Sequence, residues 1–198
     1  MVYTMSRKNL DTREKILQAS AELLVDQQGN GVRMGDIAKR TGVSRQAVYL
    51  HFATRTELLI ATTKFIDEQL QVDKRLEPSR QAKIGSERLN LYIEAWGNYI
   101  PEIYGVAKAL MNAQDSDEAA EAAWKERMEA MKDGCRAAIE ALHKDGNLSP
   151  DLKPKEAIEL LWAMLSVRNW ESLVQECGWS NKKYVDRLKL MAKKTFVV

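Results

Sequence analysis

The chain has 198 residues, of which 45% are hydrophobic and 29% charged, and its formal net charge is +2. This balance is typical of a globular protein that buries its own core, and it excludes disordered and fibrous classes. The N-terminus lacks the apolar core of a signal peptide, and no apolar run could cross a bilayer, so we expect a soluble cytoplasmic protein with no membrane partner.

The charge is unevenly distributed along the chain. Residues 1–51 carry eight Lys or Arg against five acidic side chains, whereas the remainder carries 22 against 23. The positive potential therefore lies at the N-terminal end, as phosphate binding requires. Because the excess is small, we expect binding to such a partner to depend on dimerisation.

The first predicted helix runs from about Thr12 to Gln28. Asp11 and Glu14 resemble a capping box at its start, and Gly29 and Gly31 are expected to end it. Its apolar stripe consists of Ile16, Ala19, Leu23 and Leu24.

Residues 34–52 then predict two short helices joined by a sharp turn. Gly42 suits the left-handed backbone that closes a helix, and Ser44 is a good N-cap for the second one. Small Ala38 permits a close helix crossing. Such a pair is a helix-turn-helix, whose second helix can enter a DNA major groove by its N-terminus. The alternative is a structural hairpin within an unrelated helical bundle.

The next helix is predicted over residues 54–78, opened by a T-x-x-E capping box. We expect it to bridge a DNA-binding domain, residues 1–53, and a larger helical domain, residues 54–198. A polar loop follows at residues 79–86.

Several further helices are expected beyond this loop. One contains Trp96, another begins near Pro101, and a long one presents a continuous face from Trp124 to Leu142. Pro154 suits the first turn of a helix that is apolar nearly all round between residues 157 and 167. Gly178 is expected to end that helix, and Ser180 to cap the last one, whose stripe is Tyr184, Leu188, Met191 and Phe196. The predicted fold class is all-α.

The segments TREKILQASAELL and MGDIAKRTGVSRQAVYLHFATRTELL, followed by a helical C-terminal region, resemble the tetracycline-repressor (TetR) family of bacterial transcriptional regulators. The resemblance covers about Thr12 to Leu59 and is weaker downstream. It implies an all-helical homodimer whose N-terminal heads bind a palindromic operator. It also implies that a small molecule bound in the C-terminal half weakens DNA binding.

The resemblance assigns DNA-contacting residues. Gln pairs with adenine, Arg with guanine, and Ala can touch a thymine methyl, so the three residues after the Ser44 cap are expected to read bases. Other side chains are expected to contact phosphates. Arg33 stands where the family often has Ser or Thr, and Gly35 where it often has a basic residue. The expected DNA-binding set is Arg33, Ser44, Arg45, Gln46, Ala47, Tyr49, His51 and Arg55.

Aromatic and methionine side chains gather on several predicted C-terminal helices, and such residues suit a bulky apolar ligand. For any one of them, an ordinary place in the core is the simpler interpretation. Arg168 could anchor the ligand, or could face solvent or a partner subunit. The candidate ligand-binding residues are Trp96, Tyr99, Tyr104, Trp124, Met128, Met131, Trp162 and Arg168.

The last two predicted helices are candidates for a symmetric four-helix dimer contact, although they could instead pack only within the subunit. The candidate interface residues are Leu161, Leu165, Tyr184, Leu188 and Met191.

The sequence therefore predicts a ligand-responsive, homodimeric transcriptional repressor. The alternative is a DNA-binding protein without small-molecule control that acts with a protein partner or architecturally. No catalytic motif favours an enzyme, no cofactor is expected, and the spacing of histidines and cysteines does not indicate a metal site. Cys135 and Cys177 are expected to be buried, reduced thiols, with a redox switch as the less favoured alternative.

Overall fold

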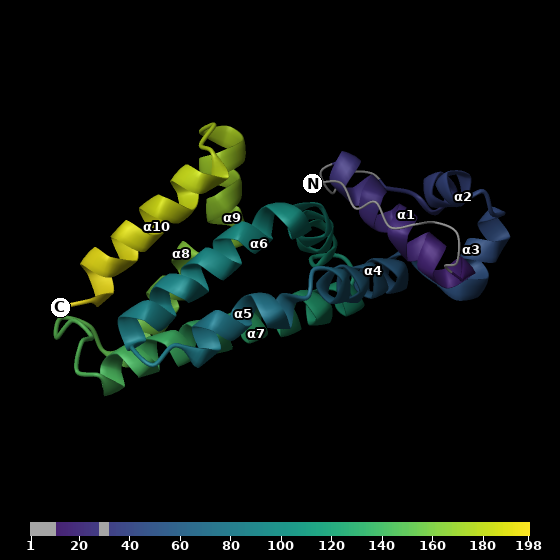
Figure 1. Ribbon diagram of the computed structural model, residues 1–198. Coiled ribbons are helices and arrows are strands. Elements are labelled where there is room, and N and C mark those ends of the chain that lie inside the picture. Colours follow the sequence, from purple (N-terminus) through teal and green to yellow (C-terminus); the bar gives the residue numbers. More distant parts are fainter. Residues whose placement is uncertain (1–10, 28–31) are drawn as a thin grey trace. The chain divides into compact units, whose positions relative to one another are not determined.

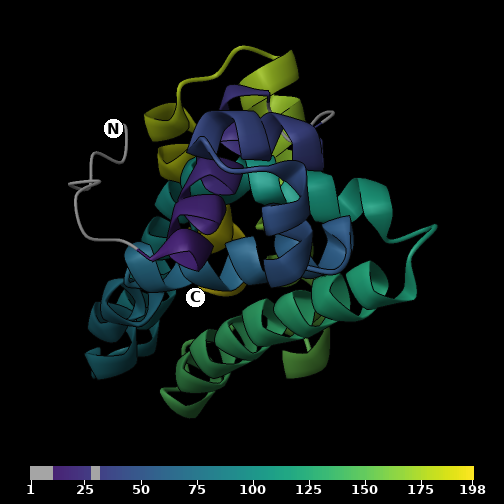
Figure 2. The ribbon, with the colours of Figure 1, turned by 90° about the vertical axis from the view of Figure 1, so that its right-hand side faces the viewer.

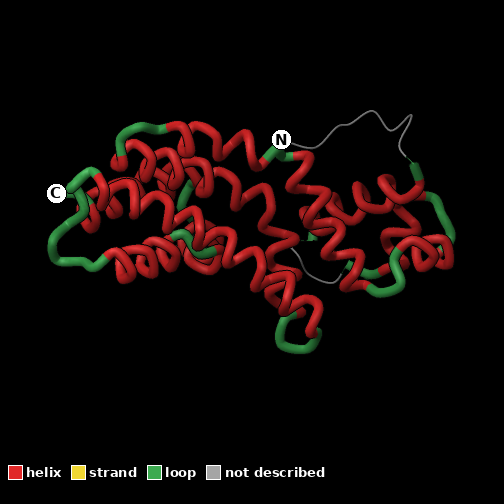
Figure 3. Tube along the Cα trace, turned by 90° about the horizontal axis from the view of Figure 1, so that it is seen from below, coloured by secondary structure: helices red, strands yellow, loops and turns green. Residues whose placement is uncertain are grey.

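The computed structural model describes residues 11–27 and 32–198, and within them every regular element is a helix (Figures 1 and 3), so the all-α prediction is confirmed. The helices are α1 (Thr12–Asp26), α2 (Met34–Thr41), α3 (Arg45–His51), α4 (Arg55–Gln69), α5 (Val72–Gln81), α6 (Gly85–Ala113), α7 (Glu118–Lys144), α8 (Pro154–Met164), α9 (Val167–Trp170), a π-helical turn η1 (Glu171–Glu176) and α10 (Asn181–Phe196). The predicted end of the first helix at Gly29 and Gly31 lies outside the described residues.

The described chain divides into two compact units. The first contains the described residues up to Leu70 together with Glu102–Lys125, and the second contains Gln71–Pro101 and Glu126–Val198. Helices α6 and α7 each contribute residues to both units. The predicted functional boundary between residues 53 and 54 stays a prediction, but the packing groups α4 with the three helices before it.

The first unit is built around α1, which contacts α2 and α4, while α2 contacts α3 (Figure 2). Fully buried side chains from α1, α3 and α4 meet in this core, among them Ile16, Val48 and Leu58. Buried hydroxyls also join α1 to α4, because Thr62 Oγ1 donates a hydrogen bond of 3.0 Å to Ser20 Oγ. The predicted N-caps form as expected, since Asp11 accepts a hydrogen bond from the backbone N–H of Glu14 at 2.7 Å.

The prediction of a single helix over residues 54–78 is wrong. Helix α4 ends at Gln69, and Gln71 takes a left-handed backbone with φ of 49° before α5 begins. Pro78, where the helix was expected to end, lies inside α5. The break carries no glycine or proline signal, because the residue that adopts the left-handed conformation is a glutamine.

Pro101 also lies inside a helix, so the two helices predicted on either side of it are one helix, α6. Its ring removes one backbone donor, but the residues around it are strongly buried: Ile100 is inaccessible to solvent, and Ile103 is 3% exposed. Burial of this apolar stripe outweighs the lost hydrogen bond. A turn follows α6, and Asp117 caps α7 by accepting hydrogen bonds from the backbone N–H groups of Ala119 and Ala120.

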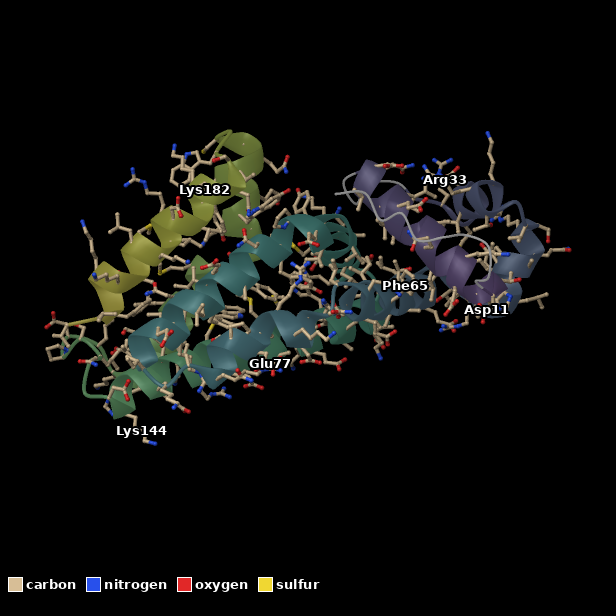
Figure 4. The ribbon with its side chains drawn as sticks, in the orientation of Figure 1. Asp11, Arg33, Phe65, Glu77, Lys144 and Lys182 are labelled. Atoms are coloured by element: carbon tan, nitrogen blue, oxygen red, sulfur yellow. The ribbon has the colours of Figure 1, made fainter. Side chains whose placement is uncertain are left out.

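In the second unit, aromatic side chains connect α6 to its neighbours. Tyr92 Oη donates to the carbonyl oxygen of Met131 on α7 at 2.7 Å, and Trp96 Nε1 donates to that of Leu165 at 2.9 Å. The loop after α7 is tied to the C-terminal end, because the backbone N–H of Ser149 donates to the carbonyl of Phe196 at 2.9 Å. Figure 4 labels Lys144 at the end of α7.

The segment between α8 and α10 is less regular than expected. The helix predicted to run from Pro154 until Gly178 ends at Met164, and Ser166 caps the short α9, which leads into η1. Cys177 follows η1 and is exposed, so only Cys135 is buried as predicted. Burial raises the pKa of the Cys135 thiol to about 12, which keeps it protonated. Among the described helices, none combines the length and apolar character that crossing a membrane needs.

Candidate nucleic-acid interface

The turn between α2 and α3 has the predicted geometry. Gly42 adopts a φ of 74° and a ψ of 20°, and the backbone N–H of Val43 donates back to the carbonyl of Ala38 at 3.1 Å. Ser44 then caps α3, since its hydroxyl accepts a hydrogen bond from the backbone N–H of Ala47 at 3.1 Å. The chain therefore turns between α2 and α3 at residues 42–44, and the N-cap hydroxyl of Ser44 is hydrogen-bonded at the start of α3.

Helix α3 buries one side and exposes the other. Val48 is fully buried, and Phe52, just after the helix, is 1% exposed. The predicted base-reading residues Arg45 and Gln46 are exposed, and Ala47 is half-buried. Tyr49 and His51, the predicted phosphate contacts on this helix, are also exposed.

Arg45 and Tyr49 interact on the exposed surface of α3. An Nη2 hydrogen of Arg45 is donated to Tyr49 Oη at 3.3 Å, and the guanidinium carbon lies 5.5 Å from the centre of the tyrosine ring. This hydrogen bond raises the pKa of Arg45 above its ordinary value, so the side chain stays cationic. The contact orients a cation beside a phenol at the start of α3.

Two further arginines stand at helix starts. Arg33 precedes α2, where Figure 4 labels it, and its backbone N–H donates to Asp36 Oδ2 at 3.2 Å. Arg55 is the first residue of α4, and its Nε donates to the carbonyl oxygen of Val32 at 3.0 Å. Both side chains are exposed, and helix N-termini favour anions.

An open cleft of about 920 Å³ brings four predicted DNA-binding residues together within the first unit. They share the cleft with residues at the corner between α6 and α7, which the sequence did not assign to the site. Ser44, Gln46, Ala47 and His51 do not line it. The predicted residues that do are Arg33, Arg45, Tyr49 and Arg55, and the corner residues are Ala109, Asn112, Ala113, Ser116 and Asp117.

The α6–α7 corner is joined directly to the start of α4. Thr56 Oγ1 donates a hydrogen bond to Asp117 Oδ2. This contact is the main cause of the lowered pKa of Asp117, and the backbone donors of Ala119 and Ala120 add to it. Because the two partners are 61 positions apart in the sequence, no local sequence signal could have revealed the bond.

Arg40 has a structural role. Its guanidinium donates to Asp26 Oδ2 at 2.8 Å and to Glu22 Oε2 at 3.2 Å, which ties the end of α2 to α1. These bonds raise the pKa of Arg40. One of the positive charges of the N-terminal region therefore stabilises the packing of α2 against α1.

The predicted ligand-binding residues are distributed between the two units. Tyr104 and Trp124 belong to the first unit, whereas Arg168 belongs to the second and is exposed. The others in the second unit are Trp96, Tyr99, Met128, Met131 and Trp162. Their role as one set stays a prediction.

Two buried polar atoms of the second unit have no hydrogen-bond partner: Trp162 Nε1 on α8 and Tyr184 Oη on α10. Buried donors are normally paired with protein, water or ligand. Burial raises the pKa of the Tyr184 phenol, which therefore remains protonated and able to donate. Trp96, by contrast, is already paired with the backbone.

The predicted interface residues divide by burial. Leu161, Leu165, Tyr184 and Leu188 are at most 3% exposed within the single chain, whereas Met191 is 50% exposed. The first four therefore pack within the subunit, which was the alternative considered for them. Apolar side chains that do reach the surface of α8 and α10 are Leu160, Leu190 and Met191.

Comparison with known proteins places this motif in a family. A family model described as "Bacterial regulatory proteins, tetR family" matches residues 16–62, which include α2, the turn and α3. This segment matches the TetR family. Family members are DNA-binding transcriptional regulators, and the helix-turn-helix of this chain consists of α2, the turn and α3.

Two curated relatives match different lengths of this chain. The transcriptional regulator CymR of Pseudomonas putida is 25% identical over 166 residues, covering 82% of this chain and 78% of CymR. The nucleoid occlusion factor SlmA of Marinomonas sp. (strain MWYL1) is 38% identical over 66 residues, which cover 33% of this chain and only 34% of SlmA.

A solved structure agrees over nearly the whole chain. A transcriptional regulator from Saccharomonospora viridis, crystallised in complex with choline, superposes with a TM-score of 0.81. The alignment covers 94% of this chain and 97% of that one at 17% identity. The likeness therefore concerns the fold.

Proposed function

We propose that this protein is a homodimeric repressor that binds a palindromic operator and is released from it by a small, largely apolar ligand. The observation that carries the proposal is the exposed face of α3, presented by a capped start and a left-handed turn. A helix held in this way can enter a major groove N-terminus first.

Base reading belongs to the residues at the start of α3. Arg45 and Gln46 are exposed and long enough to reach guanine and adenine edges, and Ala47 can touch a thymine methyl. Phosphate contacts belong to Arg33, Tyr49, His51 and Arg55, with Ser44 holding the helix start. Because phosphate contacts carry no sequence information, they set affinity and register.

Dimerisation supplies the second recognition helix. Two heads separated by about 34–36 Å would reach successive major grooves on one face of the DNA. The apolar side chains exposed on α8 and α10 support a symmetric interface there, with Met191 the one predicted residue that a partner can reach.

The ligand site is proposed for the second unit. Trp162 Nε1 and Tyr184 Oη are buried donors that lack partners, and the candidate residues Trp96, Tyr99, Met128 and Met131 belong to the same unit. A mainly apolar molecule with a hydrogen-bond acceptor would satisfy such donors. Because α6 and α7 belong to both units, a ligand that selects one arrangement of these helices in the second unit would bias residues 102–125 in the first.

The test has two stages. The protein is used to select duplexes from a random DNA pool, and the enriched sequence is examined for two inverted half-sites. Small apolar compounds are then screened by thermal shift, and those that stabilise the protein are tested for release of the selected duplex. No enriched sequence would overturn operator binding, whereas stabilising compounds that never release DNA would overturn control by a ligand.

A second candidate function is supported by the similarity to SlmA over one third of this chain. In that case the protein binds DNA without small-molecule control and acts with a protein partner or architecturally. Selected duplexes that remain bound in the presence of every stabilising compound would favour this function. Release by even one such compound would favour the repressor.

A further inference from the structure

Leu50 on α3 is unusually exposed for a large apolar side chain. Its exposed fraction is 87%, higher than that of the other exposed large apolar residues of the described chain, which range from 41% to 75%. Single exposed leucines are common on protein surfaces and need no explanation by themselves. The position of Leu50 on the helix is what gives its exposure a meaning.

Helix geometry places Leu50 in the middle of the outward face. Successive residues turn by about 100°, so Leu50 points about 160° away from both Val48 and Phe52, which are buried. Residues three and four apart are neighbours on a helix surface. Leu50 is therefore adjacent to Ala47 and Gln46, both assigned above to base reading.

We propose that Leu50 is a specificity-determining residue that contacts the C5-methyl group of a thymine next to the base read by Gln46. A leucine side chain can neither donate to nor accept from a phosphate or a base edge. The apolar group that the major groove offers is the thymine methyl. This assignment rests on the proposed operator binding through α3 and extends its reading surface by one turn of the helix.

The test removes the methyl group from the DNA and the side chain from the protein. The duplex selected by the wild-type protein is synthesised with each thymine replaced in turn by deoxyuridine, which lacks the C5-methyl group. Affinities are measured for the wild-type protein and for Leu50→Ala. Burial of one methyl group corresponds to about fourfold in affinity, so we expect a single deoxyuridine at the contacted position to weaken wild-type binding by about that factor.

The decisive result is the coupling between the two changes. Leu50→Ala should lose affinity for the thymine duplex and should be insensitive to deoxyuridine at that one position. Ile84→Ala, which shortens an apolar side chain that is 54% exposed just before α6, should keep the full wild-type sensitivity. Thermal unfolding and Leu50→Gln, which keeps the side-chain length, distinguish a lost contact from a disturbed helix.

Two outcomes would overturn the assignment of Leu50 alone. One is a Leu50→Ala protein that keeps the wild-type sensitivity to deoxyuridine at every thymine. The other is an equal loss of affinity for the thymine duplex, all deoxyuridine duplexes and unrelated DNA, as a sugar or structural contact would give. A pool from which no sequence is enriched would instead overturn operator binding itself, and the assignment of Leu50 with it.

Discussion

Two glycines of the helix-turn-helix make opposite backbone demands at the residue scale. Gly42 has a φ of 74° in the turn, whereas Gly35 lies within α2. An added Cβ would meet nothing within 4 Å at either position. Any effect of an alanine is therefore a backbone effect, which makes the two positions a matched pair.

We expect Gly42→Ala to destabilise the protein by about 1–2 kcal/mol, because an L-residue is strained in the left-handed region. Gly35→Ala should be neutral or stabilise by up to about 1 kcal/mol, since alanine favours a helix over glycine. Urea unfolding followed by circular dichroism measures both changes. Equal losses for the two variants would contradict the backbone explanation.

The Tyr49 hydroxyl, proposed to contact a phosphate, accepts a hydrogen bond from Arg45. We expect Tyr49→Phe to leave the unfolding temperature unchanged and to weaken binding to the selected and to unrelated duplexes by the same factor, about three- to tenfold. Fluorescence anisotropy with both duplexes measures this. A loss confined to the selected duplex would mean that Tyr49 acts by positioning Arg45 and not as a phosphate contact.

At the scale of elements, α1 and α6 pack with almost no space between their backbones at Gly105. A Cβ there would lie 2.3 Å from the carbonyl oxygen of Leu24. Because the obstacle is backbone, it can be relieved only by moving one helix. At Gly97 of the same helix, the nearest obstacle is a side-chain methyl group of Val185, 2.8 Å away, which can adjust more easily.

We expect Gly105→Ala to destabilise the first unit by about 1–3 kcal/mol and to weaken DNA binding, because α1 supports the helix-turn-helix. Gly97→Ala should cost less and should leave DNA affinity close to that of the wild type. Thermal unfolding and anisotropy provide the two readouts. Equal effects of the two substitutions on DNA affinity would contradict a specific role for the α1–α6 contact.

The bond between Thr56 and Asp117 connects α4 with the α6–α7 corner and gives a pH-dependent prediction. The pKa of Asp117 is lower in the folded protein than its ordinary value near ~3.9, so the stabilisation is fully present above that pH. It is lost as the pH falls through the lowered pKa. We expect Thr56→Val to lower the urea midpoint at pH 7, and the difference from wild type to shrink below about pH 4.

Ser116→Ala is the control for this bond, because the Ser116 hydroxyl donates only within its own turn, to the carbonyl of Ala113. Its effect on the urea midpoint should be independent of pH. A Thr56→Val difference that is as large at low pH as at pH 7 would show that the Asp117 charge contributes nothing to the contact.

At the scale of the whole molecule, the proposed repressor needs a partner over its exposed apolar residues. We expect Leu160→Glu combined with Met191→Glu to convert a dimer into a monomer, because a buried unpaired carboxylate is costly in an interface. Operator affinity should then fall by about tenfold or more, since the two heads no longer bind as one. Sedimentation velocity and anisotropy measure the two effects.

Ile84→Glu, which adds the same charge at another exposed apolar position, is the control for the dimer and should remain dimeric. A wild-type protein that sediments as a monomer would contradict the homodimer. If the doubly substituted protein remains dimeric, the interface does not include these residues of α8 and α10.

The local geometry of the candidate site could be predicted from short stretches of the sequence. The N-caps at Asp11, Ser44 and Thr54 and the left-handed turn at Gly42 formed as predicted. These features depend on a few hydrogen bonds and one backbone angle within four residues, so their signal is contained in a short stretch of chain. The exposed position of Leu50 follows from the same helical periodicity and could also have been found.

The places where helices are interrupted, and the residues that cover them, depend on tertiary packing and could not be predicted from local sequence. The predicted bridging helix is interrupted at Gln71, and α6 continues past Pro101. Leu161 and Leu165 are buried within the subunit. Thr56 is also joined to Asp117. Each of these results depends on side chains brought together from distant parts of the chain, and their packing free energy outweighs the weak local preferences that a sequence pattern reports.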